Sequence, residues 1–155
     1  MDTYKVINDT LVNLINEIWV EEGQAIITAE FKDITNNDMH IIEKVDLGEG
    51  KSMSAIAKEM NVTVGTLTSS MNSLVKKGYV ERFRTENDRR VVYIKLTEKG
   101  IAAYHHHAEY HRQMTLAIME RLTEEEVPVL MKMLEGLTGF FRGFGKEPKI
   151  QETEK

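Results

Sequence analysis

Residues 52–77 read SMSAIAKEMNVTVGTLTSSMNSLVKK, and this stretch predicts two consecutive helices joined by a tight turn. Ser52 is a residue type that caps helix N-termini, so we expect it to open a short helix that reaches Met60. The turn falls at residues 61–63, and a longer second helix follows it. Gly78 comes next and suits the left-handed conformation in which many helices end. The stretch therefore predicts a helix-turn-helix.

The two helices are expected to share one small core. Its members are apolar and recur at helical spacing: Ala55, Ile56, Met60, Val62, Leu67, Met71 and Leu74.

A β-hairpin is predicted directly after the second helix. Residues 79–83 and 91–96 are rich in strand-forming side chains, and the polar, charged stretch 84–90 separates them. The tip of this hairpin carries Arg84, Arg89 and Arg90. A basic hairpin beside a helix-turn-helix can act as a wing that reaches the DNA backbone or a minor groove.

The exposed face of the second helix carries short polar side chains that can approach base edges and phosphates. We take the candidate reading face to be Thr63, Thr66, Ser69, Ser70 and Asn72. Taken alone, such a face is also typical of an ordinary solvated helix. The basic hairpin next to it favours DNA binding.

The charge distribution agrees with this interpretation. The formal net charge of the 155 residues is −5, but residues 76–95 hold seven Lys/Arg against three acidic residues. That segment is therefore net positive, and the remainder of the chain is strongly acidic. An acidic protein with one basic feature can present that feature alone to a duplex.

Composition excludes several other classes of protein. The chain has no cysteine, so it has neither a disulfide framework nor a thiolate metal site. It shows no leader peptide and no long apolar run, so we expect a soluble cytoplasmic protein. Gly-rich phosphate loops and the Ser-x-x-Lys and Gly-x-Ser-x-Gly nucleophile motifs are absent, so we do not expect an enzyme. A winged helix that binds a protein partner is the remaining alternative.

Helical patterns flank the helix-turn-helix on both sides. Residues 6–29 show apolar side chains at helical spacing, and Thr35 with Asp38 resembles a capping box for another helix. A long helix opens at Thr97, and Thr123 begins a capping box for a last helix that reaches about Phe144. The last two helices hold more apolar residues than one chain can easily cover, which predicts a homodimer: Leu116, Ile118, Met119, Leu122, Val129, Leu130, Met133, Leu134, Leu137, Phe140 and Phe141.

Three segments together resemble the signature of the MarR (multiple antibiotic resistance regulator) family: LVKKGYVER at 74–82, NDRRVV at 87–92 and LTEKG at 96–100. The resemblance implies a mainly α (α+β) fold, a homodimer and a repressor that reads a pseudo-palindrome in duplex DNA. By position, Asp88 and Arg90 match the Asp-x-Arg wing motif of the family, in which the arginine approaches the minor groove and the carboxylate orients a wing arginine.

The same resemblance sets the expected domain boundaries. The resemblance implies a single MarR-type domain, 1–155. Its winged-helix lobe spans 35–96, its dimerisation helices span 1–34 and 97–145, and a disordered tail spans 146–155.

Histidines form one candidate sensing site. His107 and His111 are four residues apart, which places both on one helical face, the spacing at which two imidazoles can hold one zinc ion. With His40 and with Glu21 or Glu22, they are similar in arrangement to the site of zinc-uptake repressors in the same family. A solvated or hydrogen-bonding histidine cluster is the alternative interpretation.

An acyl ligand is the other candidate effector. EFKDI at 30–34, DMH at 38–40 and VTVGTLT at 62–68 resemble the fatty-acid-biosynthesis repressors of Gram-positive bacteria. In those repressors an acyl chain on acyl carrier protein is the corepressor. For this chain we expect no required cofactor, with an acyl ligand or zinc as the effector. The expected acyl pocket, whose residues also suit a plain core, is lined by Trp19, Ile26, Phe31, Met39 and Tyr104.

Overall fold

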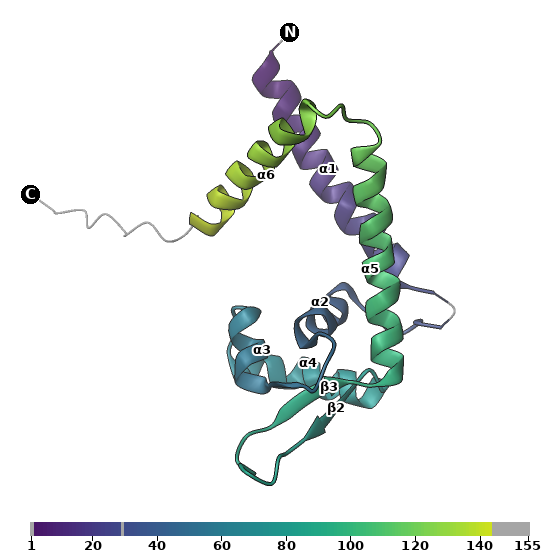
Figure 1. Ribbon diagram of the computed structural model, residues 1–155, viewed down its shortest axis with the longest axis vertical. Helices are drawn as coiled ribbons and strands as arrows, with labels where there is room; N and C mark the ends of the chain where they lie inside the picture. Colours follow the sequence, from purple (N-terminus) through teal and green to yellow (C-terminus); the bar gives the residue numbers. More distant parts are fainter. Residues whose placement is uncertain (1, 29, 144–155) are drawn as a thin grey trace, which may run out of the picture. The chain divides into compact units, whose positions relative to one another are not determined.

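The computed structural model describes residues 2–28 and 30–143, which form two compact units divided between His111 and Arg112 (Figure 1). The helices are α1 (Thr3–Ile26), α2 (Asn36–Val45), α3 (Met53–Glu59), α4 (Val64–Lys77), α5 (Glu98–Met119) and α6 (Glu126–Gly143). The mainly helical α+β fold with a winged helix-turn-helix is thereby confirmed. The expected tail at 146–155 lies outside the described residues.

Three short antiparallel strands complete the first unit, in the order β1-β3-β2. β2 (Val80–Phe83) and β3 (Tyr93–Leu96) form the predicted hairpin, and the loop between them extends away from the helices (Figure 1). β1 (Lys51–Ser52) was not predicted, because two residues are too few to show the alternation of a strand. It adds a third strand through the pairing of Lys51 with Ile94.

Capping side chains set the ends of the helices, mostly as the sequence predicts. Thr35 and Asp38 form a full capping box on α2. The Ser52 hydroxyl accepts from the Ala55 amide at 3.1 Å at the start of α3. Gly78 ends α4 with a φ of 82°, a backbone conformation that favours glycine. The first helix differs, because Asp2 caps it and α1 already begins at Thr3 rather than Val6.

One hydrophobic core joins α2, α3, α4, the sheet and the first turns of α5. Ile56, Leu67, Met71 and Leu74 are buried in it, as predicted, and Met60 packs against it. The predictions for Ala55 and Val62 were wrong, because both residues are exposed. In the seven-residue α3 the inward row is Met53, Ile56 and Ala57, and Val62 lies in the turn before α4. The apolar spacing of the sequence suits Ala55 and Ala57 alike, and only the packing of α3 shows that Ala57 is the buried one.

The N-terminal turn of α5 crosses the chain directly after α4 at very short range. Tyr79 is fully buried at the start of this crossing, and its hydroxyl donates to Asp33 Oδ1 at 2.8 Å. Its carbonyl oxygen accepts from the Thr97 amide at 3.1 Å. A Cβ added to Gly100 would lie 2.0 Å from the same carbonyl oxygen. Position 100 must therefore be glycine for α5 to sit where it does.

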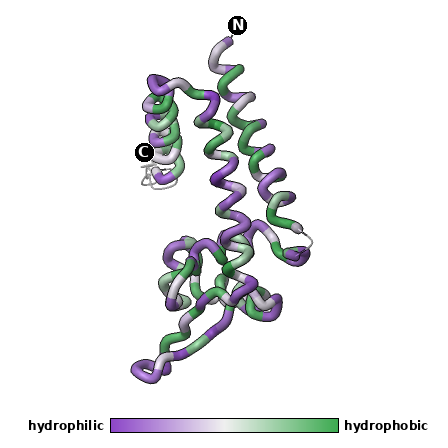
Figure 2. The backbone as a smooth tube through the Cα atoms, turned by 45° about the vertical axis from the view of Figure 1, so that its right-hand side comes forward, coloured by the Kyte–Doolittle hydropathy of each residue, from purple (hydrophilic) through white to green (hydrophobic). Residues whose placement is uncertain are grey.

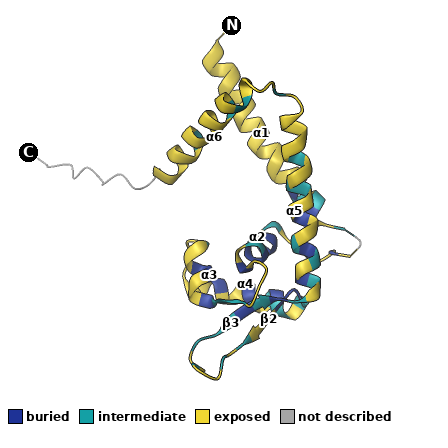
Figure 3. Cartoon of the chain, in the orientation of Figure 1, coloured by how far each residue is buried: buried dark blue, intermediate teal, exposed yellow. Residues whose placement is uncertain are grey.

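Apolar residues recur along α1 and α6 (Figure 2), and most residues of both helices are exposed (Figure 3). On α1 these include Ile7, Leu11, Ile15 and Trp19, and α6 has no buried residue at all. Within the described part of the chain, no helix is both long enough and apolar enough to cross a membrane.

We expect Gly100→Ala to lower the free energy of unfolding by about 3 kcal/mol or more, because the added methyl group overlaps a backbone oxygen that only a movement of α5 can relieve. Urea unfolding followed by circular dichroism measures the change. Gly65→Ala on α4 is the control, since its nearest neighbour would be the Thr63 hydroxyl at 3.8 Å. Alanine there should be neutral or stabilise by up to about 1 kcal/mol. Equal midpoints for the two variants would contradict the close-approach argument.

Candidate functional site

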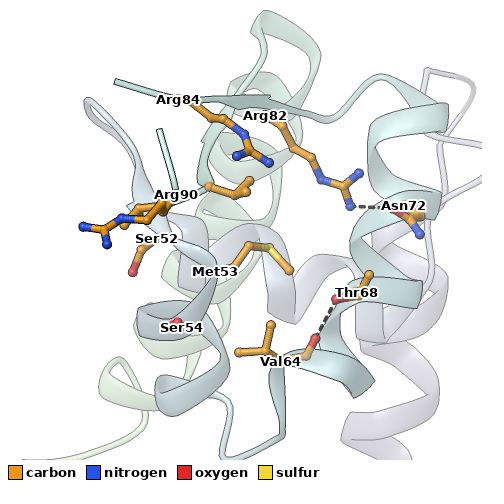
Figure 4. A pocket seen from close by; sticks show the side chains of 11 residues that line it. Ser52, Met53, Ser54, Val64, Thr68, Asn72, Arg82, Arg84 and Arg90 are labelled. Atoms are coloured by element: carbon orange, nitrogen blue, oxygen red, sulfur yellow. Dashed lines mark hydrogen bonds between the residues drawn. The ribbon is translucent and has the colours of Figure 1, made fainter. Parts of the chain in front are cut away.

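A pocket of about 470 Å³ opens between α4 and the hairpin. On one side it is lined by Val64, Thr68 and Asn72, which are spaced four residues apart and so follow one row of α4. On the other side lie Arg82, Arg84 and Arg90 of the hairpin (Figure 4). The structure therefore places a polar helix face and three guanidinium groups around one concave surface.

The predicted reading face of α4 divides into two groups. Thr66, Ser69 and Asn72 are exposed on the outward side of the helix. The Thr63 hydroxyl instead caps the helix and lies 2.9 Å from the Thr66 hydroxyl. The Ser70 hydroxyl accepts from the Asn37 side chain of α2 at 3.4 Å. The hydroxyls of Thr63 and Ser70 are thus engaged within the protein, and Thr66, Ser69 and Asn72 remain the outward candidates for a reading surface.

Thr68 and Arg82 are among the pocket residues that the sequence analysis missed. Thr68 lines the pocket, with its hydroxyl donating to the Val64 carbonyl at 2.7 Å. Arg82 on β2 reaches across to α4, where its Nη2 donates to Asn72 Oδ1 at 2.5 Å (Figure 4). A signal for Arg82 existed, because it stands two residues after buried Val80 and so shares the strand face that meets α4.

The tip of the wing is ordered by its own polar groups. Asp88 Oδ1 accepts from the backbone amide of Arg90 at 3.0 Å and from its Nε at 3.2 Å. Arg84 donates to the carbonyl oxygen of Arg89. The Arg90 side chain nevertheless stays 93% exposed. The carboxylate of Asp88 thus holds Arg90 through its backbone amide and its Nε, and the Arg90 side chain stays exposed to solvent.

A second polar site joins α1, α2 and α5 inside the first unit. His107 Nε2 lies 3.2 Å from Glu22 Oε1, 3.1 Å from Glu43 Oε1 and 2.9 Å from His111 Nε2. His111 Nε2 is also 3.3 Å from Glu22 Oε1. Glu22 and His107 are both buried. The structure thus brings together Glu22, His107 and His111 of the candidate set and adds Glu43.

His40 stands beside this cluster. Its Nδ1 lies 3.4 Å from the other oxygen of Glu43, Oε2, so it contacts the cluster through Glu43. Glu21 is exposed, so Glu22 is the acidic residue of α1 that takes part. Glu43 was missed because it lies three residues after His40 on a short helix whose orientation the sequence does not give.

The cluster concentrates electron-pair donors around one point. Two carboxylate oxygens and two imidazole nitrogens face each other, and each neutral imidazole can supply one proton at most. A hydrogen bond from His107 holds the pKa of Glu43 below its ordinary value, although burial opposes this. Among the described residues, the buried Nδ1 of His107 has no partner. Nitrogen and carboxylate oxygen ligands suit zinc, so the donor set fits such an ion.

The residues expected to line an acyl pocket are divided between core and surface. Ile26, Phe31 and Met39 are buried in the core, and Tyr104 packs at its edge. Trp19 is 59% exposed on α1. With Ile15, Ile18 and Glu22, it lines an open groove of about 310 Å³ on that helix.

Comparison with known proteins adds four relationships. The MarR family profile matches residues 34–92. The chain is 31% identical to the transcriptional regulator AdcR of Streptococcus pneumoniae, over 68% of this chain and 74% of that protein. It is 24% identical to the HTH-type transcriptional regulator PchR of Bacillus subtilis, over 88% of each. Among solved structures, Streptococcus pneumoniae FabT in complex with DNA superposes with a TM-score of 0.83 and 38% identity, covering 90% of this chain and 97% of FabT.

Loss of a wing cation and loss of a polar side chain on α4 should change DNA binding in different ways. We expect Arg90→Ala to weaken binding to all duplexes alike, or to relax a preference for A·T pairs, and to reduce the salt slope by about one phosphate contact. Asn72→Ala should change the preference among major-groove sequences, by about 1–3 kcal/mol at one base pair. Fluorescence anisotropy with a panel of duplexes measures both. Lys132→Ala on α6 removes an equal charge as the control, and unchanged affinity in both test variants would refute the assignment.

Proposed function

This chain belongs to the MarR family, and we propose that it controls transcription as a homodimer on a pseudo-palindromic operator. It is a DNA-binding transcription regulator. The observation that carries the assignment of its DNA-reading surface is the pocket between α4 and the wing, where Asn72 faces Arg82, Arg84 and Arg90.

Exposed apolar surface supports the homodimer. α1 exposes Ile7 and Leu11, and α6 exposes Phe140 and Phe141. Exposed apolar patches of this kind are rare on monomeric proteins and mark interaction sites. A twofold dimer would present two winged helices to half-sites about 10 base pairs apart, which is one turn of the duplex.

We expect affinity for an operator duplex to fall on the order of a hundredfold between about 50 and 200 mM salt, the loss expected for about four phosphate contacts. Fluorescence anisotropy over a salt series measures the slope. Sedimentation of the complex gives its stoichiometry, for which we expect two chains per duplex. The rival reading, a winged helix that binds a protein partner, predicts duplex binding that is weak and insensitive to salt. That result, or one chain per duplex, would contradict the proposal.

An acyl chain, carried by acyl carrier protein, is our first candidate effector. The α1 groove supports it, because Ile15, Ile18 and Trp19 offer an apolar wall beside the acidic Glu22. The resemblance of residues 30–34, 38–40 and 62–68 to fatty-acid-biosynthesis repressors points to the same ligand class. Under this reading the regulator responds to the supply of acyl chains.

Zinc is the second candidate effector, and the cluster of Glu22, His107 and His111 favours it. One ligand atom from each of the three residues lies within 4.8 Å of the others. Zinc bound there would supply positive charge that links α1 to α5. Glu43 of α2 is close enough to His107 to serve as a fourth ligand. Under this reading the regulator represses metal uptake.

Mass spectrometry under native conditions, after incubation with zinc or with acylated carrier protein, distinguishes the two effectors. We expect zinc binding to add one ion per chain, to disappear with a chelator and to fail in His111→Ala. We expect an acyl ligand to survive the chelator and to be lost in Trp19→Ala. Each variant serves as the control for the other ligand. Absence of both mass increments from the unmodified protein would refute both candidates.

A further inference from the structure

Arg82 and Asn72 form a contact between the wing and the reading helix. Arg82 lies two residues after Val80 on β2, so both side chains are on the same face of the strand. Val80 is buried in the core, whereas Arg82 is exposed. Its Nη2 donates to Asn72 Oδ1 at 2.5 Å (Figure 4). Both side chains are exposed at the rim of the same pocket. A side chain of β2 therefore orients the side-chain amide of Asn72 on the candidate reading face of α4.

The charge of Arg82 is not balanced by an acidic partner. On the opposite strand face, Glu81 pairs with Lys95 at 3.1 Å. Within the described part of the chain, no salt bridge involves Arg82. Its guanidinium has five N–H donors, so one can hold Asn72 while others remain available to a phosphate or a base.

The hydrogen bond fixes which half of the Asn72 amide faces the DNA. Asn72 Oδ1 is directed to Arg82, so the amide nitrogen with its two donors is left to face outward. An asparagine that is free to rotate can pair with adenine, accepting from N6 and donating to N7 at once. Arg82 takes one of the two lone pairs of Asn72 Oδ1 and holds that oxygen toward the wing, so the two-bond contact with adenine is disfavoured.

We propose that Arg82 is a specificity-determining positioning residue that holds the Asn72 oxygen toward the wing and presents the donors of its amide nitrogen to the major groove. The base edge that satisfies it carries acceptors: O6 and N7 of guanine or O4 of thymine. Cytosine offers only the N4 donor and is disfavoured, and adenine loses the advantage of a two-bond contact. This inference rests on the assignment of α4 as the reading helix.

The alternative for Arg82 is a plain phosphate contact. Such a contact contributes to affinity equally for all sequences and carries no base preference. The two roles therefore differ in a readout that loss of charge alone does not move, namely the preference at a single base pair.

Selection of bound duplexes from a randomised pool, followed by competition titrations, tests the proposal. Arg82→Ala should shift the preference at the base pair that Asn72→Ala also affects, with a gain for adenine of about five- to tenfold over guanine or thymine. In the Asn72→Ala background, Arg82→Ala should leave the preference at that pair unchanged. Lower ionic strength compensates for the overall loss of affinity and allows the selection to be completed.

Arg84→Ala is the matched control, because it removes an equal charge from the same pocket without touching Asn72. We expect it to weaken binding without altering the preference at that pair. If Arg82→Ala behaves like Arg84→Ala, with uniform weakening and the same selected sequences, the positioning role is refuted. If the unmodified protein shows no salt-dependent duplex binding, the DNA-reading assignment of α4 fails first, and the inference fails with it.

Discussion

The close approach of α5 to the chain that follows α4 is the constraint on which the first unit depends. Gly100 packs against the carbonyl oxygen of Tyr79, and Tyr79 is itself buried and tied to Asp33. This crossing fixes the direction in which α5 leaves the sheet. It thereby fixes where His107 and His111 meet Glu22 and Glu43. One glycine thus links the placement of the reading helix to that of the second polar site.

Polar residues of the winged helix do two kinds of work. The Thr63 hydroxyl caps α4 and the Ser70 hydroxyl accepts from α2, so both hydroxyls stabilise the position of the helix. Asp88 and Arg82 orient other side chains, since Asp88 holds Arg90 and Arg82 holds Asn72. Because a hydrogen-bonding group used within the protein is less free to meet a base, these contacts narrow the part of the surface that reads DNA.

The second polar site lies where three helices of the first unit meet. A ligand bound there would touch α1, which exposes apolar surface, and α2. Asp38 of α2 pairs with Lys77 at the end of α4 at 2.8 Å. Glu43 and Asp38 belong to the same ten-residue helix. If an effector binds at the cluster, as proposed above, the short helix α2 offers a route by which it can act on the DNA-reading lobe.

The sequence by itself determined the elements whose signals are local: the capping box of Thr35, the cap at Ser52, the left-handed Gly78 and the hairpin with its basic tip. It also indicated the family, because the wing motif is contiguous. Only the tertiary structure decided the rest. The sequence did not show that Ala57 rather than Ala55 is buried. Nor did it show three contacts between different elements: β1 with β3, Glu43 with the histidine cluster, and Arg82 with Asn72. Helical spacing gives the face of a side chain but not its partner, and the packing of whole elements supplies that partner.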